Sequence, residues 1–385
     1  MSRSAGPALY TRRFWHLWTA HFLFACAALT HPVLSRWVRS LDFDLAEVGT
    51  IMATAVLAGV LFRPLVGRLL DRSGRRSAFL AAGVLASGGF WLDLPAADSR
   101  AVLYAVRFLH GVGIGGLLGT YFTYAADLAP PERRVEGIAV FGASGLAANG
   151  VGPAFAEWLV ATWSFEVYLV AMGVLVFASL ALTLALPETQ DRPNRAGPGG
   201  FRQTALHPRL RSLWPAVFAL GGTIAATLTY LGVFVDDRGL GSISLYFVPY
   251  ASVAIAIRLA GGRLLDRIGP ARLVAPSMLP LAAGLVLLAL SRGAGLLVLA
   301  GALGGLGHGI AFPVLGALVV SRSDPALRGT AISVFTAFLD VGSLVASPAC
   351  GWISDRWGYG KMFAGLAAVL AGVAALSPGG KESRP

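Results

Sequence analysis

The chain has 385 residues, of which 56% are hydrophobic and only 13% are charged. A soluble globular domain carries roughly 25% charged residues, because polar groups must cover its surface, so this composition excludes an ordinary soluble fold. A net charge of +11 would favour a nucleic-acid partner in a soluble protein. Here the arginines lie in short segments between long apolar blocks, which argues against nucleic acid and for a lipid bilayer.

The apolar residues form two sets of six blocks. A helix of about 20 apolar residues spans the hydrocarbon layer, and in lipid only a helix or a closed barrel satisfies its own backbone. The blocks are too long and too uniform for barrel strands, so we predict an all-α membrane protein. The expected spans are 14–37, 46–66, 77–95, 101–126, 137–160 and 166–186, followed by 213–235, 243–262, 273–290, 295–320, 329–351 and 361–377.

The first block could be mistaken for a cleaved signal, because the run from Leu23 to Cys26 resembles a lipoprotein processing site. Phe24 is bulky beside the cut, however, and apolar character continues to Val38. We therefore predict a retained first helix. Cys26 and Cys350 lie in or beside apolar blocks and do not suggest a disulfide framework.

A polar linker divides the chain into an N-terminal bundle (1–186), a linker (187–211) and a C-terminal bundle (212–385). Cytoplasmic loops of membrane proteins carry an excess of Lys and Arg. Of the 31 Lys and Arg, 21 lie in segments on the side of the N-terminus, 7 on the other side and 3 within helices. We expect both termini and the linker to be cytoplasmic, and the protein to lie in the inner (plasma) membrane.

An internal repeat relates the two halves. The stretch from Arg63 to Gly74 (RPLVGRLLDRSG) recurs 195 residues later, from Arg258 to Gly269 (RLAGGRLLDRIG). Each copy closes the second helix of its half. Two halves of the same orientation are typical of a parallel six-plus-six transporter.

The first copy resembles the signature loop of the major facilitator superfamily, and its second copy is placed as in that family. The matching residues are Gly67, Asp71, Arg72, Gly74, Arg75 and Arg76, then Gly262, Asp266, Arg267 and Gly269. Arg107, Gly111 and Gly115 on the fourth helix, and Pro187-Glu188-Thr189 after the sixth, are similar to further family patterns. The resemblance implies twelve helices in two pseudo-symmetric six-helix bundles, which together act as a monomeric secondary transporter.

The resemblance also implies a gate. Gly67 and Gly74 would allow close packing and a tight turn, and Asp71 would lie near the positive N-terminal end of the eleventh helix. One of the arginines of the loop would pair with Asp127 at the end of the fourth helix. The alternative is that Arg75 and Arg76 only anchor the cytoplasmic side.

Charges at membrane depth suggest functional sites. Asp340 is expected to carry a coupling proton or to bind a cationic solute group, and its alternative is a structural partner. Arg107 is expected to relay protons or contact a solute anion, or else to form a structural hydrogen bond. His21 and His308 could face solute or a proton path, or be satisfied hydrogen-bonding residues. Arg258 lies close enough to the cytoplasmic face to snorkel.

The fifth helix carries Gly152-Pro153, which resembles the pattern of proton-driven exporters, although Ala156 and Glu157 stand where further glycines are expected. The pair would let this helix bend and approach the eighth helix.

No metal-ligand spacing or phosphate-binding loop occurs, and the Gly-rich run from Gly111 to Gly116 lies inside an apolar helix. We therefore expect no enzyme activity, metal or cofactor, but export of a small organic solute driven by the proton gradient; the alternatives are uptake by symport or uniport, or lipid flipping.

Overall fold

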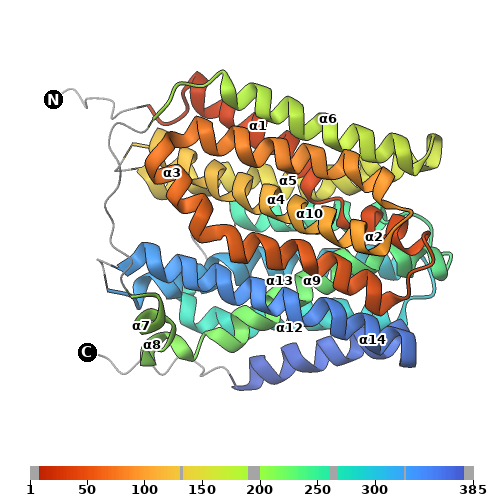
Figure 1. Cartoon of the computed structure of the whole chain (residues 1–385). Coiled ribbons are helices and arrows are strands. Elements are labelled where there is room, and N and C mark those ends of the chain that lie inside the picture. The colour runs from red at the N-terminus through yellow and green to blue at the C-terminus, as the bar shows by residue number, and fades with distance from the viewer. Residues whose placement is uncertain (1–7, 131–132, 190–199, 261–266, 325–326, 377–385) are drawn as a thin grey trace. The chain divides into compact units, whose positions relative to one another are not determined.

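The computed structural model describes residues 8–130, 133–189, 200–260, 267–324 and 327–376, which are helical with short connections and contain no strand (Figure 1). The helices are α1 (Arg12–Ala28), α2 (His31–Arg39), α3 (Leu45–Ala96), α4 (Arg100–Leu128), α5 (Arg134–Thr162), α6 (Phe165–Leu184), α7 (Phe201–Ala205), α8 (Pro208–Arg211), α9 (Trp214–Asp237), α10 (Ser244–Ala260), α12 (Pro270–Leu290), α13 (Ala294–Ser321) and α14 (Arg328–Leu376).

Ten candidate membrane spans occur among the described residues, and α10 is a shorter apolar helix. The last of the ten, α14, joins two predicted spans in one run of 49 residues. The all-α membrane prediction is confirmed, and twelve spans are consistent with these helices. The first predicted span, 14–37, is instead divided into α1 and α2. Pro32 lies in the first turn of α2, where its missing N–H needs no helical partner.

Glycines with positive φ interrupt the long helices. In α3 the backbone leaves the helical region at Gly74 (φ 85°, ψ 173°), and in α14 it does so at Gly358 (φ 81°, ψ 162°). Gly269, with φ 90°, lies just before α12. Glycine adopts positive φ without steric cost. Gly74 and Gly269 are matching positions of the sequence repeat, so the repeat encodes one kind of turn in both halves.

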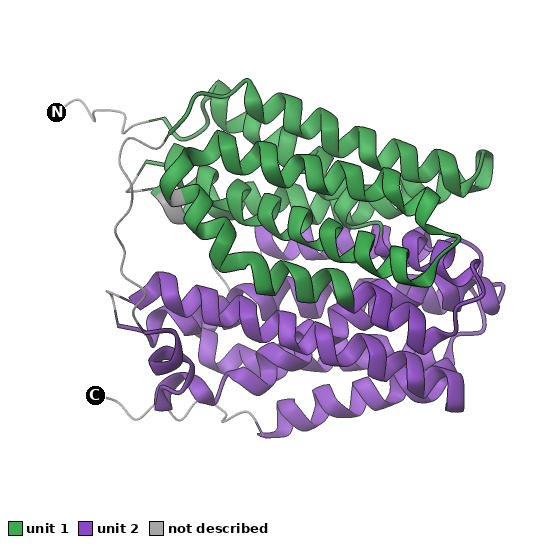
Figure 2. Cartoon of the chain, in the orientation of Figure 1, with its two compact units in different colours: residues 1–30, 54–195 green, residues 31–53, 196–385 purple. Residues whose placement is uncertain are grey.

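The chain forms two compact units, which Figure 2 colours separately. The first comprises Met1–Thr30 and Thr54–Arg195. In it α1 packs against α5 and α6, and α4 packs against α3 through glycines. A Cβ added at Gly111 would lie 2.0 Å from the carbonyl oxygen of Ala55, and one at Gly113 would lie 2.4 Å from the backbone nitrogen of Ala86. The Gly-rich run of α4 therefore serves helix packing, as its apolar context predicted.

The second unit comprises His31–Ala53 and Ala196–Pro385. Its most extensive packing is between α9 and α14, α12 and α13, and α10 and α13. The early segment 31–53 joins this unit because α2 packs on α9: a Cβ at Gly232 would lie 2.0 Å from the carbonyl oxygen of Pro32.

Polar contacts strengthen this attachment. Arg36 of α2 pairs with Asp236 of α9, Nε to Oδ2 at 2.5 Å. Asp355 of α14 accepts hydrogen bonds from the backbone N–H groups of Leu45 and Ala46, at 3.1 and 2.9 Å, and so caps the first turn of α3.

Candidate transport and gating residues

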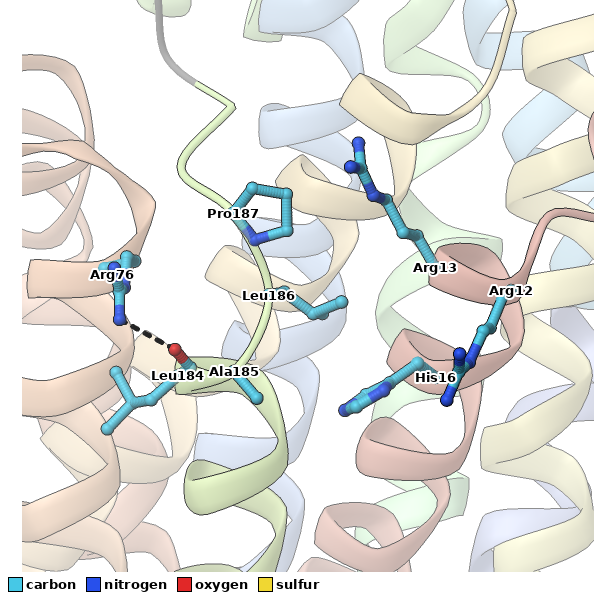
Figure 3. Close-up of a pocket in the computed structure, with 8 residues that line it drawn as sticks. All are labelled: Arg12, Arg13, His16, Arg76, Leu184, Ala185, Leu186 and Pro187. Atoms are coloured by element: carbon cyan, nitrogen blue, oxygen red, sulfur yellow. Dashed lines mark hydrogen bonds between the residues drawn. The ribbon is translucent and has the colours of Figure 1, made fainter.

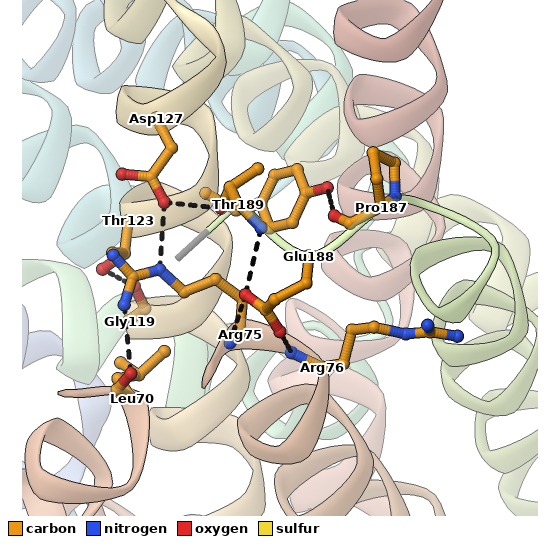
Figure 4. Close-up of polar contacts among 10 residues, drawn as sticks. Leu70, Arg75, Arg76, Gly119, Thr123, Asp127, Pro187, Glu188 and Thr189 are labelled. Atoms are coloured by element: carbon orange, nitrogen blue, oxygen red, sulfur yellow. Dashed lines mark hydrogen bonds and ion pairs between the residues drawn. The ribbon is translucent and has the colours of Figure 1, made fainter. Parts of the chain in front are cut away.

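Arg75, the first helical residue after the break at Gly74, is the centre of a polar cluster in the first unit (Figure 4). Its Nε donates to Oδ2 of Asp127 at 2.9 Å, and one terminal nitrogen donates to the carbonyl oxygen of Leu70 at 3.1 Å. Of the arginines predicted to pair with Asp127, Arg75 makes the contact. Thr189 donates its hydroxyl to the same carboxylate oxygen at 2.8 Å. The turn after the first half of α3, the end of α4 and the segment after α6 thus form one site.

Glu188 completes this cluster and was noted in the sequence only as part of a motif. Its carboxylate accepts the backbone N–H groups of Arg75 and Arg76 at 2.9 and 3.0 Å. These are the first N–H groups after the break at Gly74, where a helix has no internal acceptors and where the helix dipole favours an anion. Glu188 therefore caps the second half of α3.

Other residues of the signature loop have different roles. At Gly67 no atom of the described residues lies within 4 Å of the place that a Cβ would occupy, so the described part of the chain does not show the close packing predicted for Gly67. Arg72 and Arg267 are both exposed helical residues. The side chain of Asp71, and the whole of Gly262 and Asp266, lie outside the described residues.

A buried cluster of ionisable groups lies in the first unit. Arg107 of α4 is 2% exposed and Asp93 of α3 is fully buried, with 3.2 Å between a terminal nitrogen of Arg107 and Oδ2 of Asp93. The same nitrogen lies 2.8 Å from Nδ1 of His110. Within the described part of the chain, neither the other oxygen of Asp93 nor Nε of Arg107 has a hydrogen-bond partner.

Sequence reasoning identified Arg107 but missed Asp93. The signal was present, since Asp93 is an acidic residue inside the predicted span 77–95, where a charge is costly. What the sequence could not give was the pairing, because Asp93 and Arg107 lie on different helices. In the structure the guanidinium of Arg107 is paired with a carboxylate. The structural contact that the sequence suggested for Arg107 is therefore a buried ion pair and not only a hydrogen bond.

His21 of α1 is buried among aromatic rings. Its Nδ1 lies 2.6 Å from the hydroxyl of Ser144 on α5, and its ring contacts Tyr121 and Phe141, with centroids 5.1 and 4.6 Å apart. Nε2 has no hydrogen-bond partner among the described residues. The structure thus favours the structural alternative for this histidine.

His308 belongs to a second cluster, in the second unit, where it forms a hydrogen bond with the hydroxyl of Tyr250. Arg258, two turns along α10 from Tyr250, places its guanidinium over the ring of Phe312, with 5.9 Å to the centroid. Phe312 in turn contacts Phe335 of α14. Nε of Arg258 is buried without a hydrogen-bond partner in the described residues. Arg258 therefore packs on an aromatic surface, which the snorkelling expectation did not foresee.

Asp340 is partly exposed on α14, in a stretch that packs closely on α9. A Cβ added at Gly221 would lie 2.2 Å from the carbonyl oxygen of Leu339, and one at Gly342 would lie 2.1 Å from that of Phe218. Close backbone packing just before and just after Asp340 therefore fixes where this residue lies relative to α9. Its role as a proton carrier stays a prediction.

The fifth predicted span, α5, runs through Pro153 as one helix. The sequence suggested the eighth helix as the close neighbour of this region. The atom that Gly152 approaches is the carbonyl oxygen of Cys26 on α1, which would lie 2.4 Å from an added Cβ. Gly152 and Cys26 thus contribute to packing within the first unit.

The described residues also contain no group of three His, Cys, Asp or Glu side chains arranged for a metal ion.

A cavity of about 500 Å³ opens between the start of α1 and the end of α6 (Figure 3). Three arginines, Arg12, Arg13 and Arg76, line it together with His16 and the segment 184–187. Arg76 donates to the carbonyl oxygen of Leu184 at 2.8 Å. This basic pocket is distinct from the two buried clusters.

The sequence and the fold of the chain are similar to those of known proteins. The family model of the Major Facilitator Superfamily matches residues 17–346 and 243–378. The chain is 27% identical over 379 residues to an uncharacterized MFS-type transporter of Burkholderia mallei, covering 92% of this chain and 89% of the relative. It is 25% identical over 340 residues to one of Salmonella typhimurium, covering 84% of each.

Solved structures show the same fold. The nucleoside transporter NupG is similar with a TM-score of 0.77 at 16% identity, over 97% of this chain and 100% of that one. The human organic anion transporter MFSD10 (TETRAN) has a TM-score of 0.69 at 18% identity, over 95% and 100%. The chain therefore belongs to the Major Facilitator Superfamily, and it is a multi-pass membrane protein and a secondary transporter that works by alternating access, not an enzyme.

Proposed function

We propose that this transporter exports a small organic solute from the cytoplasm in exchange for protons, across the bacterial inner membrane and with both termini cytoplasmic. It acts as a monomer and needs no cofactor, since the proton gradient supplies the energy. The alternatives are uptake by symport or uniport, and lipid flipping.

The observation that supports proton coupling is the buried group of Asp93, Arg107 and His110. A carboxylate and an imidazole beside one guanidinium can exchange a proton while the cation remains. Protonation of Asp93 would release Arg107 from its ion pair and change the balance of charge inside the bundle. Asp340, on the other unit, is the second candidate carrier, as the sequence predicted.

The proposed direction rests on the fifth helix, where Gly152-Pro153 resembles the pattern of exporters. The structural neighbours named as nucleoside and organic anion transporters share only the fold, but both names describe small organic solutes. A solute of this kind is what we propose here.

We propose that Arg258 contacts this solute. Its guanidinium packs on the ring of Phe312, and its buried Nε has no hydrogen-bond partner among the described residues. A buried donor without an acceptor is costly. An anionic group on the solute would supply the missing acceptor for this nitrogen. The Tyr250–His308 hydrogen bond beside it provides neutral polar groups for orientation.

The experiment compares small molecules inside cells and in the medium, with and without the protein, by mass spectrometry. In cells that contain the protein, we expect the concentration of one class of solute to be lower inside the cell and higher in the medium. The solute so identified is then followed in proteoliposomes with an imposed pH gradient, where uphill movement should require the gradient.

Asp93→Asn and Asp340→Asn are tested in the same vesicles. The variant that removes the proton carrier should lose uphill transport but keep downhill exchange. Asp98→Asn, an exposed carboxylate just after the same helix as Asp93, is the matched control and should behave as wild type. Uphill movement without a pH gradient would contradict coupling, and net accumulation inside cells would contradict export.

A further inference from the structure

The basic pocket between α1 and α6 has an excess of positive charge that its own lining does not neutralise (Figure 3). Arg12, Arg13 and Arg76 contribute three guanidinium groups, and none of the described residues that line the pocket is acidic. Its volume of about 500 Å³ is large enough for a small charged group together with its bound water.

Two of the three arginines are available to a ligand. Arg76 already donates a hydrogen bond to the carbonyl oxygen of Leu184. Nε2 of His16 forms a hydrogen bond with the carbonyl oxygen of Leu182, at 3.0 Å. Arg12 and Arg13 are exposed, and neither side chain forms a hydrogen bond or ion pair with another described residue. Guanidinium groups bind phosphate oxygens in a bidentate manner, so the pocket is complementary to a phosphate group.

Aromatic side chains place this pocket at the depth of lipid headgroups. Trp15 is 47% exposed and Tyr10 is 45% exposed, and their rings stack with centroids 6.0 Å apart. Tyr and Trp are enriched where the hydrocarbon layer meets the headgroups. Arg12 and Arg13 lie between these two residues in the sequence, and therefore at the same level.

We propose that the pocket binds the phosphate of an anionic phospholipid headgroup, such as phosphatidylglycerol. The predicted cytoplasmic position of the N-terminus places it in the leaflet whose anionic lipids attract basic segments. The site uses neither the buried ion pair nor the proposed solute contact at Arg258, and so it does not depend on what is transported.

The test measures lipid retention by native mass spectrometry of protein purified with equal amounts of phosphatidylglycerol and phosphatidylcholine. Wild type should retain phosphatidylglycerol preferentially. In the double variant Arg12→Gln/Arg13→Gln, affinity for phosphatidylglycerol should fall about five-fold for each arginine removed, or roughly 25-fold together. Both side chains are exposed, so the variant should fold, and size-exclusion chromatography verifies this.

The matched control is Arg209→Gln/Arg211→Gln, which removes two exposed arginines from α8, outside the pocket. It should retain the lipid as wild type does. Equal retention by the pocket variant and this control would overturn the proposal, as would equal binding of phosphatidylcholine. Inorganic phosphate and glycerol phosphate are tested in detergent without added lipid: if either raises the melting temperature as much as phosphatidylglycerol does, the ligand is a soluble phosphate and the lipid assignment is wrong.

Discussion

Removal of one partner of the Asp93–Arg107 pair should destabilise the protein strongly. The two side chains are 0% and 2% exposed and approach to 3.2 Å. Loss of one member of a buried ion pair costs about 3–5 kcal/mol, because the remaining charge is left without compensation. Asp93→Asn keeps the shape of the side chain and removes only the charge. We expect it to lower the free energy of unfolding by about 3 kcal/mol, since a single hydrogen bond joins the pair and His110 still contacts the cation.

A double-mutant cycle measures this effect. Asp93→Asn, Arg107→Gln and the double variant are unfolded reversibly in mixed micelles of increasing SDS content, and the free energies of unfolding are compared. The free energy of unfolding should fall less in the double variant than the sum of the losses in the two single variants, because the double variant leaves no unpaired charge.

Additive losses would refute the argument for an ion pair. A loss below about 1 kcal/mol for Asp93→Asn, with a large loss for Arg107→Gln, would show that Asp93 is already protonated in this state. In that case Arg107 would be held by other groups, and the carboxyl would not compensate its charge.

Three further predictions concern the turns, the attachment of residues 31–53 and the topology. Gly74→Ala should lower the free energy of unfolding by about 1–3 kcal/mol, because φ of 85° with ψ of 173° is a conformation essentially restricted to glycine and the new Cβ would meet Glu188 at 2.6 Å. Gly67→Ala should instead be neutral or slightly stabilising in the same unfolding assay, because alanine favours the helix and the new Cβ would meet no described atom within 4 Å; equal losses for the two variants would contradict this explanation. Asp355→Ala should remove a helix cap worth about 1 kcal/mol and speed hydrogen exchange at the first amides of α3, and unchanged exchange would show that the cap is dispensable. A protease should cut within 187–211 in inside-out membrane vesicles and spare it in right-side-out ones; the reverse pattern would overturn the predicted orientation.

Much of the fold could be predicted because a bilayer restricts the solutions. Apolar blocks of span length in a chain with few charges leave only helices, and the structure confirms this. The signature loop was also readable: positive φ at Gly74 and Gly269 explains why the glycine recurs at the same place in both repeats. The division at 186 and 212 stays a prediction about the duplicated halves, whereas the compact units in this structure place residues 31–53 with the C-terminal helices.

The sequence by itself therefore determined the class of protein, the helical spans, the family and the positions that deserve attention, since hydropathy and short motifs are local properties. Only the tertiary structure decided which of these residues meet. Asp93 with Arg107, Glu188 with the backbone after Gly74, and Arg258 with Phe312 each join two different segments of the chain. Such pairings depend on how each helix is rotated about its axis and on which glycines allow close approach, and no local pattern specifies either.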